Sequence, residues 1–157
     1  MKTIFVTVGS THFDALIDII DSTEFIELAR DKGYDKIIVQ HGNYHRECTH
    51  VTKAFDYAKP AEIKEYFNGA DLVIGHAGAG TILEVLGIGK PLFVVVNDSL
   101  MDNHQTELAR ALKENGVLVM SGVSDFLPVF SSSQFEPHTL KLDPQPLVNQ
   151  LNEHFQF

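Results

Sequence analysis

Short apolar runs rich in β-branched residues recur along the chain, and this pattern limits the possible folds more than any other feature. The runs cover residues 3–8, 36–40, 72–75, 92–96 and 117–120, and helical patterns separate most of them. They lack the alternation of half-exposed strands, which indicates burial on both faces. This order is typical of an α/β fold with a Rossmann-like parallel sheet and helices on both faces. A chain of 157 residues fits one such domain.

Helix punctuation places the segments between these runs. We expect helices near residues 13–20, 25–32, 61–67, 81–86, 103–115 and 145–154. Asp21-Ser22-Thr23 interrupts the first two, and Gly33 and Gly116 follow helix ends, where a left-handed backbone favours glycine. We expect a short strand near residues 50–55 and an extended, proline-containing connection from Ser121 onward. Residues 1–122 then form the sheet domain, and residues 123–157 are an extension of the same domain.

The composition excludes several classes of partner. The formal net charge is −9, from 21 acidic and 12 basic residues, whereas direct binding to nucleic acid or anionic lipid requires a basic face. Cys48 is the single cysteine, so no internal disulfide can form and a reducing compartment is expected. The N-terminal apolar run is too short for a signal sequence or a membrane span. We therefore expect a soluble, cytoplasmic protein that reaches a membrane only through a partner.

Glycines are concentrated between the run at 72–75 and the helix that follows it. The segment 75–81 reads GHAGAGT, and such a turn allows a ligand to approach the backbone closely. The dinucleotide pattern G-x-G-x-x-G is missing because position 83 is leucine, and no Gly-Lys-Ser/Thr sequence follows as in a P-loop. The turn therefore predicts a diphosphate or sugar cradle of another type.

Local structure offers an alternative role for each polar residue near this turn. Thr81 and Glu84 match a capping box, in which each side chain binds a backbone N–H; alternatively, Glu84, in the first helical turn, binds ribose hydroxyls. The Gly9-Ser10-Thr11 turn either binds an anion at a helix N-terminus or lets a hydroxyl cap that helix. His76 is either a phosphate ligand or a structural histidine.

Amide and carboxylate side chains gather after the run at 92–96. Asn97 and Asp98 end that strand, and the next helix opens with Asp102, Asn103, His104 and Gln105. Groups that donate and accept hydrogen bonds suit sugar hydroxyls, which do the same. Ser99 and Asp102 could instead form a second capping pair.

Three histidines, His41, His45 and His50, surround Cys48 and raise the question of a metal site. No pair among them has the CxxC or helical HxxxH spacing of a zinc site. We therefore predict no metal site and interpret the segment as a loop.

Three segments together closely resemble one family. They read FVTVGST at 5–11, DLVIGHAGAGT at 71–81 and VNDSLMDNHQ at 96–105. The family is the cytosolic catalytic subunit of the two-subunit UDP-GlcNAc transferase of dolichol-linked oligosaccharide synthesis, and the resemblance runs to about Gly122. It implies the C-terminal, donor-binding half of a GT-B glycosyltransferase, with no metal or other cofactor. The implied reaction transfers GlcNAc from UDP-GlcNAc to GlcNAc-diphosphodolichol.

The resemblance also implies a role for each candidate residue. Glu84 would bind the ribose, the diphosphate would lie against the Gly78-Ala79-Gly80-Thr81 turn with His76 beside it, and Gly9-Ser10-Thr11 would close the cleft. The sugar would face Asn103, His104 and Gln105, near Asn97, Asp98 and Asp102. No catalytic residue is assigned because the general base is expected from the other half of the enzyme.

That other half is implied to be a membrane-anchored subunit that binds the dolichol-linked acceptor. It would hold this chain at the cytosolic face of the endoplasmic reticulum. The predicted C-terminal helix carries an apolar stripe formed by Leu147, Val148, Leu151 and Phe155. On spacing alone the stripe could pack on its own sheet or on another polypeptide, and a split enzyme favours docking on the partner.

Two other functions fit parts of the pattern. One is a stand-alone nucleotide-sugar-binding protein with the same half-fold. The other is a Rossmann-like cofactor-binding module without transferase activity, which the missing third glycine disfavours.

Overall fold

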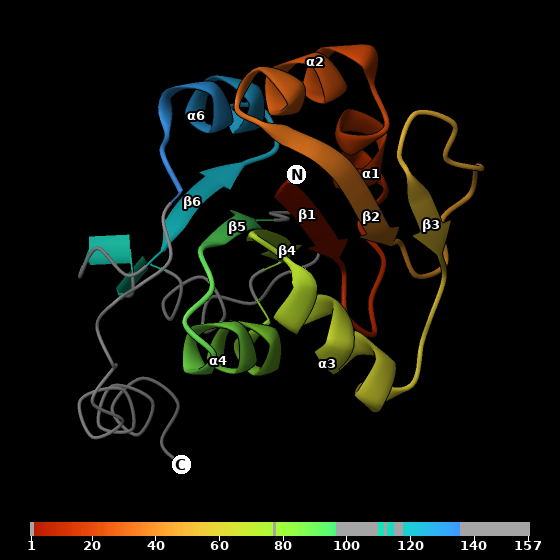
Figure 1. Ribbon diagram of the computed structural model, residues 1–157, viewed down its shortest axis with the longest axis vertical. Coiled ribbons are helices and arrows are strands. Elements are labelled where there is room, and N and C mark those ends of the chain that lie inside the picture. The colour runs from red at the N-terminus through yellow and green to blue at the C-terminus, as the bar shows by residue number, and fades with distance from the viewer. Residues whose placement is uncertain (1, 77, 97–109, 112, 115–117, 136–157) are drawn as a thin grey trace.

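The fold is built on one parallel sheet. The computed structural model describes residues 2–76, 78–96, 110–111, 113–114 and 118–135. Its six strands lie in the order β3-β2-β1-β4-β5-β6 (Figure 1), and every neighbouring pair is parallel. The strands are β1 Lys2–Thr7, β2 Tyr34–Gln40, β3 Lys53–Phe55, β4 Leu72–His76, β5 Leu92–Val96 and β6 Val119–Gly122. The predicted α/β class and parallel sheet are confirmed.

The central strands are buried on both faces, as their unbroken apolar runs predict. All five residues of β5 are buried. In β1, Ile4 and Val6 belong to one core cluster whereas Phe5, which lies between them, belongs to the other. Successive side chains of a strand point to opposite faces, so each run supplies two separate cores.

Helices cover the two faces of the sheet (Figure 1). One face carries α1 (Asp14–Ile20), α2 (Thr23–Asp31) and α6 (Phe126–Ser132), whose buried residues join the first core cluster. The other face carries α3 (Pro60–Gly69) and α4 (Ala79–Gly87), which contribute Phe67, Ile82, Val85 and Leu86 to the second cluster. A sheet covered on both faces is the doubly wound arrangement.

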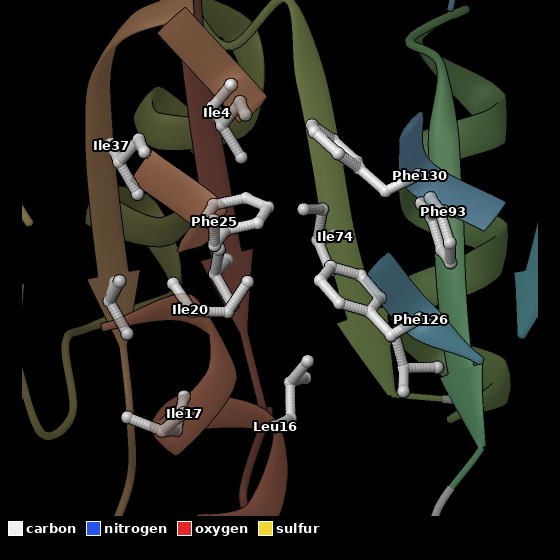
Figure 2. Close-up of a cluster of buried hydrophobic side chains, with 14 of the residues drawn as sticks. Ile4, Leu16, Ile17, Ile20, Phe25, Ile37, Ile74, Phe93, Phe126 and Phe130 are labelled. Carbon is white, nitrogen blue, oxygen red and sulfur yellow. The ribbon is translucent and has the colours of Figure 1, made fainter. Parts of the chain in front are cut away.

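Aromatic packing joins α2 and α6 to the sheet (Figure 2). The ring centroid of Phe25 lies 5.0 Å from that of Phe130 and 5.6 Å from that of Phe126. Phe93 of β5 lies 5.1 Å from Phe126. Rings at these separations attract one another beyond their burial, by about 0.5–1.5 kcal/mol per pair. The segment after β6 is thereby fixed to the same core.

Two predicted helix signals are confirmed between β1 and β2. Ser22 caps α2, and its hydroxyl accepts a hydrogen bond from the Phe25 N–H at 3.2 Å, so α1 and α2 separate where the sequence places the interruption. Gly33 has φ +94°, a conformation that glycine adopts readily. The chain can therefore turn sharply from α2 into β2.

Two predictions for the C-terminal part of the described chain are wrong. The last strand is β6, Val119–Gly122, two residues later than expected at both ends. Residues 126–132 form α6 rather than an extended connection. Pro128 is the third residue of α6, where its missing N–H would have had no partner within the helix in any case. The proline therefore does not exclude a helix there.

Other predictions fall wholly or partly outside the described residues. Of the helix expected over 103–115, residues 110–111 and 113–114 are described and are helical. The helix expected over 145–154 lies outside the described part of the chain. So does its stripe of Leu147, Val148, Leu151 and Phe155.

Strand order places the ligand-binding edge. Connections from β1 run outward to β2 and β3, and the chain then crosses back through α3 to β4, on the other side of β1. The carboxyl ends of β1 and β4 therefore flank the point where the order reverses. In open α/β sheets ligands bind in the crevice at this point.

Candidate functional site

His76 lies between the two glycine turns at the reversal point. A Cβ built on Gly9, in the turn after β1, would lie 2.7 Å from His76 Cε1, and one built on Gly78, after β4, would lie 2.4 Å from His76 Nε2. Real Cβ atoms do not approach other atoms so closely. The imidazole thus occupies space that side chains at positions 9 and 78 would fill. The turns at Gly9 and Gly78 therefore lie close together, on either side of this ring.

Burial favours the neutral form of the His76 imidazole. It lowers the pKa of His76 below its usual range, and the nearby Thr7 backbone only partly opposes this effect. Its Nδ1 is inaccessible to solvent and has no hydrogen-bond partner among the described residues. A buried polar atom without a partner is unusual and calls for an explanation. A neutral imidazole could donate a hydrogen bond to a ligand but could not supply a full charge.

Helix α4 presents its N-terminus to the same edge of the sheet. The helix begins at Ala79 with Gly78 as the N-cap residue, and no side chain within the described chain caps it. The first backbone N–H groups of an α-helix have no partner in the helix and carry a partial positive charge. Among the described residues, no heavy atom beyond the adjoining turns of the helix lies within 4 Å of the position that a Cβ on Gly80 would take. The described residues therefore leave room for an anionic ligand at this turn.

The capping-box interpretation of Thr81 and Glu84 is wrong. A capping box requires its Ser or Thr at the N-cap, but α4 begins two residues before Thr81. The alanine and glycine at positions 79 and 80 gave no polar signal that the helix starts there. Glu84 consequently lies in the second turn of α4, not the first, and its carboxylate is exposed.

The Gly9 turn confirms one prediction and contradicts another. Gly9 has φ +64°, as a tight turn after β1 requires. Neither Ser10 nor Thr11 caps the next helix, because α1 begins at Asp14 with Phe13 as its N-cap residue. The Thr11 hydroxyl instead donates to the Val8 carbonyl at 2.8 Å. Helix α1 itself begins within one residue of its predicted start, and Gly9 and Ser10 of the turn line the cleft described next.

A cleft of about 290 Å³ begins at the Gly9 turn. Its lining includes Gly9, Ser10, Thr81 and Glu84, together with Thr7, Gln40, Tyr57, Ala58, Pro60, Ile63 and Phe67. The Tyr57 side chain is 52% exposed and Phe67 is 2% exposed. The cleft therefore combines an exposed carboxylate and a glycine turn with an apolar wall from α3.

Sequence reasoning missed the wall formed by Gln40, Tyr57, Ile63 and Phe67. Gln40 is a lone amide at the end of an apolar run, and this could have indicated a functional residue. Its strand, β2, neighbours β1, so the end of β2 lies beside the Gly9 turn. Tyr57 and Ile63 lie on either side of the start of α3, and no local pattern distinguishes them from ordinary loop and core residues.

Hydrogen bonds hold the loop around Cys48 against α1. His45 Nδ1 lies 2.8 Å from Asp14 Oδ2, and the Asp21 carboxylate accepts hydrogen bonds from the Thr49 and His50 backbone. These bonds attach the loop to α1. No group of three or more His, Cys, Asp or Glu side chains suited to a metal ion is found among the described residues.

The predicted sugar-facing residues lie outside the described part of the chain. They are Asn97, Asp98, Asp102, Asn103, His104 and Gln105, together with the alternative capping pair that includes Ser99. The strand that leads to them, β5, neighbours β4. In the part of the chain that the structure describes, no helix is both long and apolar enough to cross a membrane.

Comparison with known proteins places the fold and the family. Residues 3–125 match the glycosyltransferase family 28 C-terminal domain. The solution structure of ALG13 superposes with a TM-score of 0.64 and 26% identity, covering 92% of both chains. MurG from Acinetobacter baumannii gives a TM-score of 0.59 at 21% identity over 96% of this chain and 41% of MurG, which is a likeness of fold. The predicted GT-B C-terminal half is confirmed.

Two curated relatives of this chain have the same name. The human UDP-N-acetylglucosamine transferase subunit ALG13 is 43% identical over 126 residues, which cover 75% of this chain and 11% of the human protein. This chain therefore spans about a tenth of that relative. The subunit of the same name from Yarrowia lipolytica is 37% identical over 133 residues, covering 80% of this chain and 67% of that protein. The chain therefore belongs to the glycosyltransferase family 28 C-terminal domain family, as an ALG13-type member.

Proposed function

We propose that this chain is the donor-binding half of a two-subunit transferase that moves GlcNAc from UDP-GlcNAc to GlcNAc-diphosphodolichol. The observation that carries the proposal is the N-terminus of α4, which no side chain of the described chain caps and which lies near the Gly9 turn at the reversal point of the sheet, with Glu84 on the adjoining cleft. The proposed transfer reaction is the second step in assembling the lipid-linked oligosaccharide for N-glycosylation. Relatives named as UDP-N-acetylglucosamine transferase subunits support the choice of donor.

The diphosphate is proposed to bind at the start of α4. Backbone N–H groups of Ala79, Gly80 and Thr81 are the first of this helix, and the helix dipole favours negative charge there. Charge develops on the leaving UDP during transfer, and fixed N–H groups stabilise such charge without reorganising. His76, held neutral beside Gly78, would donate one further hydrogen bond.

The nucleoside is proposed to extend from the diphosphate into the cleft. Glu84 is an exposed carboxylate on the cleft wall and can accept hydrogen bonds from the two ribose hydroxyls. Beyond it the cleft is lined by Tyr57, Ile63 and Phe67. An apolar and aromatic wall suits a planar base. We therefore assign the uracil to this end.

The sugar is proposed to lie on the other side of the diphosphate. Asn103, His104 and Gln105, with Asn97, Asp98 and Asp102 nearby, would bind its hydroxyls, since they follow β5, which neighbours β4. Gly9, Ser10 and Thr11 would close the cleft. No general base is assigned to this chain.

A membrane-anchored partner is proposed to supply the acceptor half of the site. Leu147, Val148, Leu151 and Phe155 would dock this chain on that partner, at the cytosolic face of the endoplasmic reticulum. Without the acceptor half, the bound sugar would stay in contact with water, so the isolated chain should have negligible transferase activity. Robust turnover by the purified chain alone would contradict this part of the proposal.

Calorimetric titration with UDP-GlcNAc, UDP and NADH tests the donor assignment. Glu84→Ala should weaken UDP binding about 10- to 100-fold, the loss expected for a hydrogen bond to a charged group. Glu65→Ala is the matched control, because Glu65 is a carboxylate of α3 that lines a different groove, and it should leave affinity unchanged. Equal affinity of Glu84→Ala and the native chain would refute the ribose assignment. Tighter binding of NADH than of UDP would favour a cofactor-binding module.

A further inference from the structure

Gln40 is a buried amide with no assigned role at the centre of the proposed site. It ends β2 and is 2% exposed. It is one of three buried polar residues in the described chain, the others being Thr7 and Ser121. It also lines the cleft. An amide is stable in such a position only when its polar atoms are hydrogen-bonded.

The Gln40 side chain bonds to the ends of β1 and β3 at once. Its Oε1 accepts hydrogen bonds from the Val8 N–H at 3.2 Å and the Gly9 N–H at 3.1 Å, and also from the Thr7 hydroxyl. Its Nε2 donates to the Gly9 carbonyl at 3.0 Å and to the Asp56 carbonyl at 2.7 Å. Both amide hydrogens and the carbonyl oxygen are therefore in use.

These bonds fix two turns that line the cleft. One is the turn at Gly9, which lies against His76 and whose backbone is held through both its N–H and its carbonyl. The other contains Asp56, which immediately precedes the cleft residue Tyr57. The same side chain bonds to both turns, so it contributes to the distance between them.

We infer that Gln40 is a positioning residue for the nucleotide site, which sets the width of the cleft by tying the Gly9 turn to the Asp56–Tyr57 turn. The inference rests on the proposed function. Gln40 acts through the two turns, and a preorganised cleft binds its ligand more tightly because fewer groups must be ordered on binding.

The chemistry of the amide provides a test. Gln40→Glu keeps the shape and an acceptor for the Val8 and Gly9 N–H groups, but it places a carboxylate oxygen against two carbonyl oxygens. Burial and these carbonyls favour the protonated acid. Once protonated, the carboxyl group of the Gln40→Glu variant can donate one hydrogen bond, so the variant should regain part of its function as the pH falls.

Affinity for UDP-GlcNAc is the measurement, because this ligand has no phosphate group that titrates between pH 5.5 and pH 8. We expect the affinity of Gln40→Glu to be about tenfold or more below that of the native chain at pH 8, and the ratio to narrow at pH 5.5. Gln40→Met, a neutral side chain of similar length, should lose affinity at both pH values. If Gln40→Glu does not fold at pH 8, Gln40→Met serves as the test variant at that pH.

Ile37→Val is the matched control. Ile37 lies on the same strand, 3% exposed in the first core cluster, so the variant lowers stability without touching either turn and should retain native affinity. Urea unfolding of each variant shows that the titrated protein is folded. Equal affinity of Gln40→Glu and the native chain at pH 8, or an equal loss in Ile37→Val, would overturn the inference alone. Failure of the native chain to bind UDP-GlcNAc would overturn the proposed function, and this inference with it.

Discussion

The contact between Gly78 and His76 makes a prediction that a double-mutant cycle can test. Gly78 has φ −78° and ψ 129°, a conformation that alanine adopts without strain. Its replacement by alanine would on backbone grounds stabilise the chain by about 0.4–1 kcal/mol. The added Cβ, however, would lie 2.4 Å from His76 Nε2, and overpacking of this kind costs about 1–3 kcal/mol.

We therefore expect Gly78→Ala to lower the free energy of unfolding by about 1–2 kcal/mol in the native background. In a His76→Ala background the ring is gone, and the backbone gain from alanine is opposed by the preference of an N-cap for glycine over alanine, so the same substitution should be neutral within about 0.5 kcal/mol. Gly9→Ala is the matched comparison. It meets the same ring at 2.7 Å, but with φ +64°, so a penalty of about 1–2 kcal/mol should remain after His76 is removed.

Urea unfolding followed by far-ultraviolet circular dichroism measures each corner of the cycle, since the chain contains no tryptophan. A total stability of about 5–15 kcal/mol makes differences of this size measurable. If Gly78→Ala destabilises the native and His76→Ala backgrounds equally, the ring does not occupy the space between the two turns. The position of the His76 ring between the Gly9 and Gly78 turns would then be refuted.

Three further predictions concern charge and the loop that joins β2 to β3. Burial lowers the pKa of His76, so the folded chain resists protonation of this ring. The free energy of unfolding should therefore fall more steeply below pH 6.5 in the native chain than in His76→Gln. Urea unfolding at a series of pH values measures this, and parallel pH profiles for the two proteins would contradict it. Burial and the nearby Asp21 raise the pKa of Cys48 from 9.0 to about 11, so alkylation at pH 8 should be about a hundredfold slower in the folded than in the urea-unfolded chain, as thiol titration can establish. Asp21→Ala removes the oxygen that accepts hydrogen bonds from the Thr49 and His50 N–H groups, so hydrogen exchange at those two amides should accelerate while the core amides stay protected. Unchanged exchange there would show that the loop does not depend on this carboxylate.

Strands and most of the helices could be predicted because their signals are local. β5 matches its predicted bounds because all five of its residues are apolar and buried. The break before α2 was readable from Ser22, whose capping hydroxyl is a sequence signal. The parallel arrangement followed from runs without alternation, since only strands covered on both faces have that composition.

The start of α4 and the existence of α6 could not be predicted from local signals. α4 begins in an alanine–glycine segment whose helical state depends on packing of Ile82 and Val85 against the sheet. α6 contains a proline and ends in a run of serines, and it forms because Phe126 and Phe130 reach the ring cluster of Phe25 and Phe93. In both segments tertiary packing outweighs local preference.

The candidate site was only half accessible to sequence reasoning. The glycine turns and Glu84 stand beside an apolar run and carry unusual composition, so they could be identified. Gln40 and Tyr57 line the cleft because β2, which ends at Gln40, and β3, which precedes Tyr57, lie beside β1 on one side of the sheet. Strand order is a property of the whole chain, and no short segment encodes it.

The central claim is that a uridine diphosphate sugar binds where the ends of β1 and β4 meet the N-terminus of α4. Titration of the ¹⁵N-labelled chain with UDP-GlcNAc tests it most directly, because each amide reports on its own surroundings. The largest shift changes should fall on Gly9, Ser10, Gly80 and Thr81. Changes concentrated instead around Tyr34 and Ser133, which line a separate groove, would contradict the account.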